Sequence, residues 1–301
     1  MKTRIEQNEP NDPAYGEASG TPTSQTVEVN RNSATAPTNG FRAFVRRREL
    51  VIFFGLCYLI GWSALPWGSF IAFAPLIAAI VVVSIAEGLP GLARLGRRVI
   101  RWRVNWIWYA AAIGVPLLVY VAATGLNLAA GAPAPSLDQF HPWYAVFLVF
   151  ALGVLNPLEG PLGEEPGWRG FALPRLQSRW SPLVTAAVLG LLITAWHLPL
   201  VFMPQFDLSL PDILTTILVT FWYTWLFNRT GGSVLLTLIA HATEGTVNIQ
   251  GLWRPGAGGE GAVWASMIAW ALLVIALLIF DRKFWRAAPE SAVDRVPDRI
   301  T

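Results

Sequence analysis

The stretch that decides the fold of this chain is PWYAVFLVFALGVLNPLEG (142–160), which three residues separate from EEPGWR (164–169). The first run is almost entirely hydrocarbon, whereas the second brings together two adjacent carboxylates and an arginine. A charge placed inside a bilayer costs at least about 2.5–3.5 kcal/mol, so such groups persist there when they are paired, hydrated in a cavity or used in chemistry. The two runs together indicate a membrane-embedded chain that carries a polar site.

The composition supports a membrane protein. The 301 residues are 54% hydrophobic, include 15 tryptophans and are only 14% charged, whereas soluble domains carry about 25% charged residues. The arginines lie at the ends of apolar runs, so the small net charge of +3 reflects membrane topology rather than nucleic-acid binding. The single cysteine, Cys57, excludes an intramolecular disulfide and a multi-cysteine metal site.

Apolar runs of about the length that crosses a bilayer recur along the chain. We therefore predict an all-α fold, a polytopic membrane helix bundle of about eight transmembrane helices, several of them short enough to require tilt. The predicted segments are 50–66, 69–86, 106–125, 142–160, 182–200, 211–228, 233–251 and 262–280.

Residues 1–40 are rich in Pro, Thr, Ser, Asn, Gly and Glu and are predicted to be a disordered tail. Residues 41–286 form the predicted membrane-embedded helical domain, and 287–301 a short flexible tail. Arginines cluster before the first apolar run, in connections such as 87–105 and 161–181, and after the last run. The positive-inside rule then predicts a multi-pass cell-membrane protein with both termini cytoplasmic. The 87–105 stretch is expected to be either a basic amphipathic helix on the inner leaflet or an ordinary basic loop.

The charged residues of the first polar motif are expected to have two different roles. If the helix continues past Pro166, Glu165 and Arg169 are i and i+4 residues and can form an ion pair. Glu164 is rotated by about 100° and can face a cavity. A pair of neighbouring carboxylates suits general acid or base catalysis. The alternative is an interfacial charge cluster that touches lipid headgroups.

Two of the three histidines, His197 and His241, also lie inside apolar segments. On a helix His241, Glu244, Gly245 and Asn248 share one face, and the imidazole, carboxylate and amide on it are not a lipid-facing pattern. The alternatives are an interfacial or structural role for His197 and polar helix–helix contacts for His241, Glu244 and Asn248.

The order of these residues resembles the CPBP intramembrane peptidases, also called the Abi family, which are related to the type II CAAX prenyl endopeptidases. Glu164, Glu165 and Arg169 match the first family motif in full, and Gly170-Phe171 after them also fits. The resemblance covers about residues 85–255, with a peptidase-like core predicted at 142–251.

The second and third motifs each match at their histidine. His197 precedes Leu-Pro as expected, although Ile193 stands where an aromatic residue is usual. His241 lies in a late membrane helix, but Gly245 replaces the asparagine expected four residues later. Asn248, one turn further along the same face, is expected to substitute for it, or a water molecule does so.

The resemblance implies an intramembrane endopeptidase that hydrolyses membrane-associated protein or peptide substrates. By resemblance, Glu164 is the general base, assisted by His197, and His241 polarises the peptide carbonyl. Glu165 and Arg169 would support the site, together with Glu244. The expected partners are the lipid bilayer and a membrane protein or lipid-associated peptide, and no nucleic acid.

A metal-free mechanism without a cofactor is expected. The alternative is a zinc ion held by Glu164, His197 and His241, with Glu244 as a fourth ligand. Two other functions stay open: a proton-coupled transporter or channel that uses the same ionisable groups, and a catalytically idle relative that acts by binding.

The predicted topology places Glu164 near the cytoplasmic end of its segment, far from His197. The two meet only if residues 157–181 fold back into the bundle, or if the helix that carries His197 is tilted and begins deeper. Asn156-Pro157 and Gly160-Pro161, with Gly163, supply the breaks that such a fold-back requires.

Overall fold

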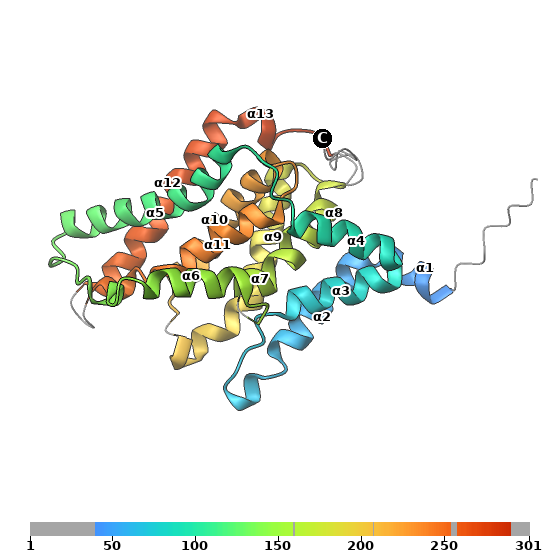
Figure 1. Cartoon of the computed structure of the whole chain (residues 1–301), viewed down its shortest axis with the longest axis horizontal. Coiled ribbons are helices and arrows are strands. Elements are labelled where there is room, and N and C mark those ends of the chain that lie inside the picture. The colour runs from blue at the N-terminus through green and yellow to red at the C-terminus, as the bar shows by residue number, and fades with distance from the viewer. Residues whose placement is uncertain (1–39, 159, 207, 254–257, 290–301) are drawn as a thin grey trace, which may run out of the picture. The chain divides into compact units, whose positions relative to one another are not determined.

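The computed structural model describes residues 40–158, 160–206, 208–253 and 258–289, and every regular element in these ranges is a helix (Figure 1). Residues 1–39 and 290–301, which hold almost all of the two predicted tails, lie outside the described residues. The longer helices are α1 (Gly40–Arg47), α2 (Glu49–Trp62), α3 (Ala74–Ala86), α4 (Gly88–Val99), α5 (Trp106–Ala129), α6 (Ala145–Leu155), α9 (Pro182–His197), α10 (Leu210–Arg229), α11 (Val234–Thr246) and α12 (Gly259–Phe280). The short ones are η1 (Leu65–Trp67), η2 (Asp138–Phe140), α7 (Gly160–Glu165), η3 (Pro166–Ala172), α8 (Leu173–Gln177), η4 (Leu198–Phe202), η5 (Pro204–Phe206), η6 (Gln250–Leu252) and α13 (Arg282–Trp285).

Six helical stretches in the described residues are long and apolar enough to cross a membrane. Five of them coincide with predicted segments, and the sixth, Ala145–Gln177, begins in the predicted segment 142–160 and runs on past it. The other two, predicted at 69–86 and 233–251, are the helices α3 and α11, which have 13 residues each. The predicted polytopic helix bundle is therefore confirmed, with six stretches long enough to span, one of them interrupted at Asn156, and two shorter helices.

The stretch 161–181, predicted as a basic connection, is instead largely helical and buried. Backbone geometry breaks at Asn156, which is extended, and α7, η3 and α8 then run without interruption from residue 160 to residue 177. The fold-back that the Pro and Gly residues allow is thus present, and the connection prediction is wrong. The η3 segment is a π-helix, in which every residue is buried.

Two glycines explain why this segment lies so deep. A Cβ added at Gly163 would lie 2.8 Å from Phe73 Cα, and one added at Gly167 would lie 2.5 Å from the Pro75 carbonyl oxygen. Only glycine therefore allows the backbone to approach the start of α3 this closely, as small residues do at helix contacts in membranes. The glycines that suggested a loop in the sequence thus allow close packing of this helical segment against α3.

Two buried clusters make up the core. The first joins α1, α2, α3, α4, η3, α8 and α9 with one residue each of α10 and α11, and within it the Phe53 and Trp168 rings pack edge to face with centroids 5.6 Å apart. The second joins α5, α10, α11 and α12 around Trp222 and Trp270. Helices α10 and α11 contact α7 or η3, so the first polar motif lies where the two clusters meet.

The basic stretch after α3 forms the helix α4, which confirms the amphipathic helix rather than the loop. Leu95 faces the core, and Arg98 Nη1 donates to the Gly170 carbonyl oxygen at 2.8 Å, whereas Arg94 and Arg97 are exposed. Burial, with a smaller contribution from the neighbouring Arg175, lowers the pKa of Arg98 to about 10. The guanidinium is still charged at neutral pH and ties α4 to the π-helix.

Candidate active site

A cavity of about 300 Å³ lies between α7, α9, α10 and α11, with α5 and α12 completing its wall. Most of the residues that line it are polar: Tyr120, Glu164, Arg169, His197, Asp212, Thr215, Thr216, Thr220, Tyr223, His241, Glu244 and Ser266. The three groups singled out by the motifs, Glu164, His197 and His241, therefore share one cavity although they are far apart in sequence.

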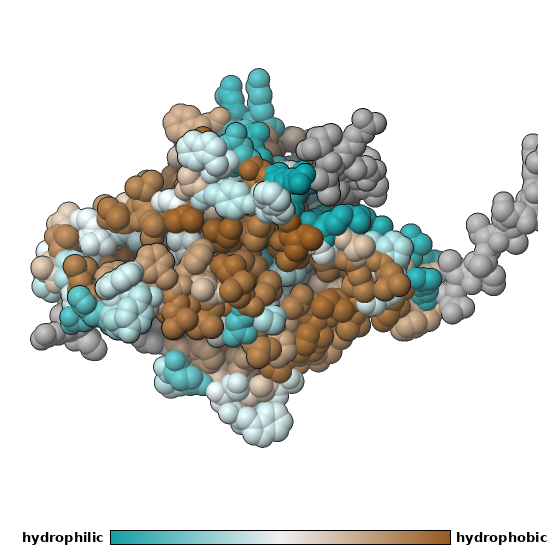
Figure 2. Space-filling view, viewed as in Figure 1, coloured by the Kyte–Doolittle hydropathy of each residue, from teal (hydrophilic) through white to brown (hydrophobic). Residues whose placement is uncertain are grey.

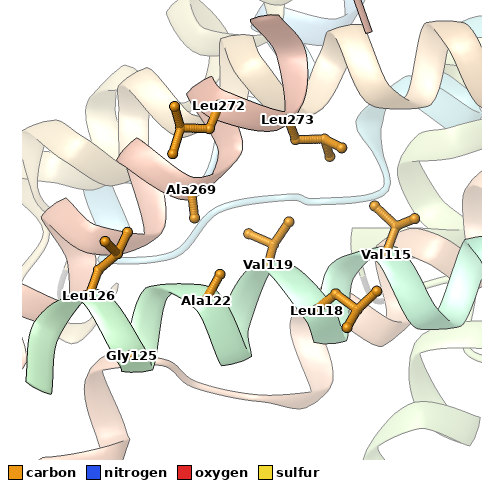
Figure 3. A pocket seen from close by; sticks show the side chains of 9 residues that line it. All are labelled: Val115, Leu118, Val119, Ala122, Gly125, Leu126, Ala269, Leu272 and Leu273. Atoms are coloured by element: carbon orange, nitrogen blue, oxygen red, sulfur yellow. The ribbon is translucent and has the colours of Figure 1, made fainter. Parts of the chain in front are cut away.

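A second and larger hollow, of about 500 Å³, lies between α5 and α12 (Figure 3). Its lining includes Val119, Leu126, Ala269 and Leu273, and it contains no ionisable side chain. An apolar groove of this kind suits hydrocarbon rather than catalysis. The candidate chemistry belongs to the smaller cavity.

Glu164 and His197 face each other across the cavity. The Trp168 indole donates to Glu164 Oε2 at 3.2 Å, and Glu164 Oε1 is 4.0 Å from His197 Nε2. His197 Nδ1 lies 3.0 Å from the Ile193 carbonyl oxygen, which can only accept, so Nδ1 carries a hydrogen. In the neutral ring Nε2 is then a bare acceptor directed at the carboxylate.

Glu165 is fully buried and bonds in two directions. Its Oε1 accepts from Arg169 Nη1 at 2.8 Å, which confirms the predicted i, i+4 ion pair, and from His241 Nδ1 at 3.0 Å. The Arg169 guanidinium also lies 4.6 Å from the centre of the Tyr223 ring. Glu165 therefore orients His241 as well as pairing Arg169, and it leaves His241 Nε2 for the cavity.

Glu244 forms the opposite side of the site. Its Oε2 accepts from the Tyr223 hydroxyl at 2.5 Å, and its backbone carbonyl accepts from the Tyr120 hydroxyl at 3.0 Å. His241, Glu244 and Gly245 all line the cavity, so these three share a face as predicted.

Asn248 does not belong to this face, and that prediction is wrong. Helix α11 ends at Thr246 and Val247 is extended, so the 3.6-residue spacing stops before Asn248. The Asn248 side chain instead accepts from the Gly251 N–H at 3.0 Å, and its backbone bonds to the Gln139 side chain. Asn248 is exposed and is not among the residues that line the cavity.

Sequence reasoning missed Tyr223 and the polar face of α10. Asp212, Thr216, Thr220 and Tyr223 lie at i, i+4, i+8 and i+11, which places them on one side of that helix. This stripe in an otherwise apolar span is the signal that could have identified them.

A metal site is not formed by these groups as they stand. Among the described residues, no set of three or more His, Cys, Asp or Glu side chains is arranged to hold a metal ion. His197 and His241 each use Nδ1 in another hydrogen bond, so only their Nε2 atoms would be available as ligands.

Two curated proteins are similar to parts of this chain. Over 88 residues the chain is 31% identical to CAAX prenyl protease 2 of Methanococcus maripaludis, and this match covers 26% of the chain and 32% of that protein. Over 206 residues it is 28% identical to a probable multidrug resistance protein NorM of Caulobacter vibrioides, which covers 65% of this chain and 38% of that protein. The matches thus span about a third of the length of each curated relative.

The family comparison falls on the residues that build the cavity. Residues 142–247 match the family described as type II CAAX prenyl endopeptidase Rce1-like. This range includes both carboxylates of the first motif, His197 and His241. Residues 142–247 are therefore similar to the Rce1-like family, and the resemblance predicted from the motifs is confirmed over this part of the chain.

Proposed function

We propose that this protein is an intramembrane endopeptidase that hydrolyses peptide bonds of membrane-associated proteins or peptides. The observation that carries the proposal is the 4.0 Å approach of Glu164 Oε1 to His197 Nε2 in a cavity shared with His241. Two acceptors at this separation can both receive hydrogen bonds from one water molecule.

The proposed reaction begins with that water. Glu164 takes a proton from it while the water oxygen attacks the carbonyl carbon of the scissile peptide, and His197 holds the second hydrogen. The proton then passes to the leaving amine nitrogen as the C–N bond breaks. Trp168 holds the other oxygen of Glu164, which fixes the carboxylate in position for this transfer.

His241 is the proposed donor to the developing oxyanion. Glu165 accepts from Nδ1 and favours the charged imidazolium, whose Nε2–H then faces the cavity. Hydrogen-bond donors aimed at the oxyanion are usually a large part of the rate acceleration. Since Gly245 provides no side chain beside it, the site has one donor fewer here than the family motif provides.

The test is hydrolysis of a membrane-peptide library by the purified full-length protein, with products identified by mass spectrometry. We expect Glu164→Gln to abolish cleavage. Glu260→Gln is the matched control, because Glu260 is an exposed acid outside the cavity and the chemical change is the same. Equal cleavage by wild type and Glu164→Gln would reject the role of Glu164.

The proposed mechanism uses no metal and no cofactor. Its partners are the bilayer and a membrane protein or lipid-associated peptide, in a cell membrane with both termini of the chain cytoplasmic. Cleavage that survives a zinc chelator is the expected result. Loss of cleavage in chelator, restored by added zinc, would favour the alternative site at Glu164, His197 and His241.

A second candidate function is proton-coupled transport, because ionisable groups inside a membrane often form proton relays. The cavity holds Glu164, Glu244 and two histidines, which could relay protons. Substrate-dependent proton flux into proteoliposomes would support transport, and the peptidase proposal expects none. A protein with neither activity that still binds membrane peptides would match the idle relative.

A further inference from the structure

One side of the cavity carries polar groups that the proposed reaction does not use. The general base and its assisting histidine lie on α7 and α9, whereas these groups lie on α10, α11 and α12. We call them the acceptor face, and they are Asp212, Thr215, Thr216, Glu244 and Ser266. Their hydrogen bonds indicate which kind of ligand the face can bind.

The threonine hydroxyls of the acceptor face use their hydrogens on their own helix. Thr215 Oγ1 donates to the Pro211 carbonyl at 2.8 Å, and Thr216 Oγ1 donates to the Asp212 carbonyl at 3.3 Å. A hydroxyl has one hydrogen and two lone pairs. Because the hydrogens are already used, both threonines can offer only lone pairs to the cavity.

The two tyrosines that line the cavity also donate their hydroxyl hydrogens within the protein. Tyr223 donates to Glu244 Oε2 at 2.5 Å, and Tyr120 donates to the Glu244 backbone carbonyl at 3.0 Å. A phenol has no second hydrogen for a ligand. The tyrosines therefore hold Glu244 in place without adding a donor to the acceptor face.

The two carboxylates of the acceptor face each keep one oxygen that accepts from no described residue. Both hydrogen bonds to Asp212, from the backbone and the hydroxyl of Ser209, end on Oδ2, and the Tyr223 bond to Glu244 ends on Oε2. Figure 2 shows mostly hydrophobic residues across the side of the helix bundle that is seen there. Unpaired charges inside such an apolar surround are costly, so these carboxylates favour a ligand that brings a positive charge.

Ser266, on α12, is an independent indication of a polar ligand. It lines the cavity and is only 6% exposed, yet its hydroxyl bonds to no other described residue. A buried hydroxyl without a hydrogen-bond partner is destabilising. The hydroxyl can rotate, so it can turn a lone pair toward a donor in the cavity.

The charges of the cavity lining favour the same kind of ligand. Among the described lining residues Glu164, Asp212 and Glu244 are acidic, and Arg169 is the only lysine or arginine. Arg169 is already paired with the buried Glu165 at 2.8 Å. The acceptor face therefore carries negative charge that no lysine or arginine of the lining neutralises.

We propose that the acceptor face binds a cationic N–H donor of the substrate, an ammonium or a guanidinium group. Its place in catalysis rests on the proposed function. Glu244 lies three residues after His241 on α11, and side chains at this spacing are neighbours, with about 5–6 Å between their Cβ atoms. The substrates are then membrane peptides that carry a lysine or arginine close to the scissile bond.

The test uses a series of otherwise identical membrane peptides in which a single lysine occupies successive positions. A matched series carries acetyl-lysine, which lacks the charge. Binding is measured by fluorescence anisotropy on full-length Glu164→Gln protein in a neutral detergent, so that no hydrolysis is needed. We expect at least about tenfold tighter binding of the lysine peptide at one or more positions, because charge-assisted hydrogen bonds to Glu244 and Asp212 are lost on acetylation.

Glu244→Gln, made in the same background, tests the location of the site. Glutamine keeps a carbonyl oxygen that can accept from Tyr223 and loses only the charge. We expect the lysine preference to fall to about twofold or less. Glu260→Gln is the matched control, because it removes an exposed acid outside the cavity and should keep the full preference.

Ser266→Ala is a second variant, so that a poorly folded Glu244→Gln protein does not decide the result. It removes one neutral acceptor, and we expect the lysine preference to fall by about threefold. Equal binding of the lysine and acetyl-lysine peptides at every position would overturn the inference. A lysine preference that both variants leave intact would also overturn it.

Hydrolysis by the wild-type protein is a separate arm, which separates this inference from the proposed function. If binding prefers lysine and depends on Glu244 but no peptide is cleaved, the cation site stands and the peptidase proposal fails. If the lysine and acetyl-lysine peptides bind equally and are cleaved at equal rates, the peptidase proposal stands and the cation site is rejected.

Discussion

The segment that brings Glu164 and Arg169 to one wall of the cavity packs so closely on α3 that a Cβ added at Gly167 would come within 2.5 Å of a backbone oxygen. On the opposite wall, Gly245 has nothing within 4 Å. The first wall, α7 and η3, is buried along its whole π-helical part and matches the family motif in full. The second, the end of α11, is the place where this chain departs from the motif.

The difference teaches where substitution is tolerated. On the packed wall a new side chain would have to displace backbone atoms of α3. The residue types around Glu164 are therefore restricted by close packing as well as by their role in the site. On the open wall a side chain can be added or lost without repacking. A change of catalytic power or substrate range is therefore structurally easier at residue 245 than at Gly163 or Gly167.

The largest expected effect comes from the packed wall, at Glu165. In Glu165→Gln the buried Arg169 loses its anionic partner, and breaking a buried ion pair by removing one member costs about 3–5 kcal/mol. His241 also loses the acceptor that orients it. Thermal unfolding of the full-length protein in one detergent measures the loss of stability.

Glu164→Gln is the matched comparison, because it changes the adjacent carboxylate in the same way. Its partners are the Trp168 indole and, at 4.0 Å, His197, so we expect a much smaller loss of stability together with loss of hydrolysis. Equal destabilisation by the two variants would show that both carboxylates stabilise the fold. It would contradict the assignment of a structural role to Glu165 and a catalytic role to Glu164.

The next effect, in activity, comes from the open wall. Gly245→Asn restores the amide that the family motif expects, in space that is free for it. One oxyanion donor is worth about 10²–10³ in kcat, so a gain of about 10- to 100-fold is expected even with imperfect geometry. Steady-state cleavage of a fixed membrane peptide measures kcat and KM separately.

Gly245→Ala is the control for that gain. It adds a Cβ and stiffens the end of α11 without providing a donor. An equal increase in kcat for alanine and asparagine would assign the effect to helix stiffness rather than to the amide, and the proposed oxyanion role of this wall would be wrong.

Much of this architecture could be predicted from local sequence patterns. Hydropathy located the spans, and the i, i+4 spacing predicted the Glu165–Arg169 pair, because both depend on neighbours along one helix. The fold-back at residues 157–181 was visible only as a set of possible breaks. Whether the chain uses such breaks depends on α3 receiving Gly163 and Gly167, which is a tertiary contact.

The facing wall shows what such patterns miss. Tyr223 bonds Glu244 across two helices, and no spacing along either helix encodes that meeting. The prediction for Asn248 extended helical spacing past Val247. There the β-branched Thr246 and Val247, and an Asn248 side chain that accepts from the nearby Gly251 N–H, favour ending the helix. The 3.6-residue spacing predicts which side chains share a helix face only for residues inside the helix, and α11 ends at Thr246.

The smallest expected effect tests that last point. Asn248→Ala removes one exposed hydrogen bond, to the Gly251 N–H, which is worth about 1 kcal/mol or less. We expect kcat within about twofold of wild type, because the side chain does not reach the cavity. Gln139→Ala should destabilise the connection more, since Gln139 bonds both the N–H and the carbonyl of residue 248. A tenfold fall in kcat for Asn248→Ala with unchanged stability would instead return Asn248 to the site, and would require α11 to extend past Thr246 when substrate binds.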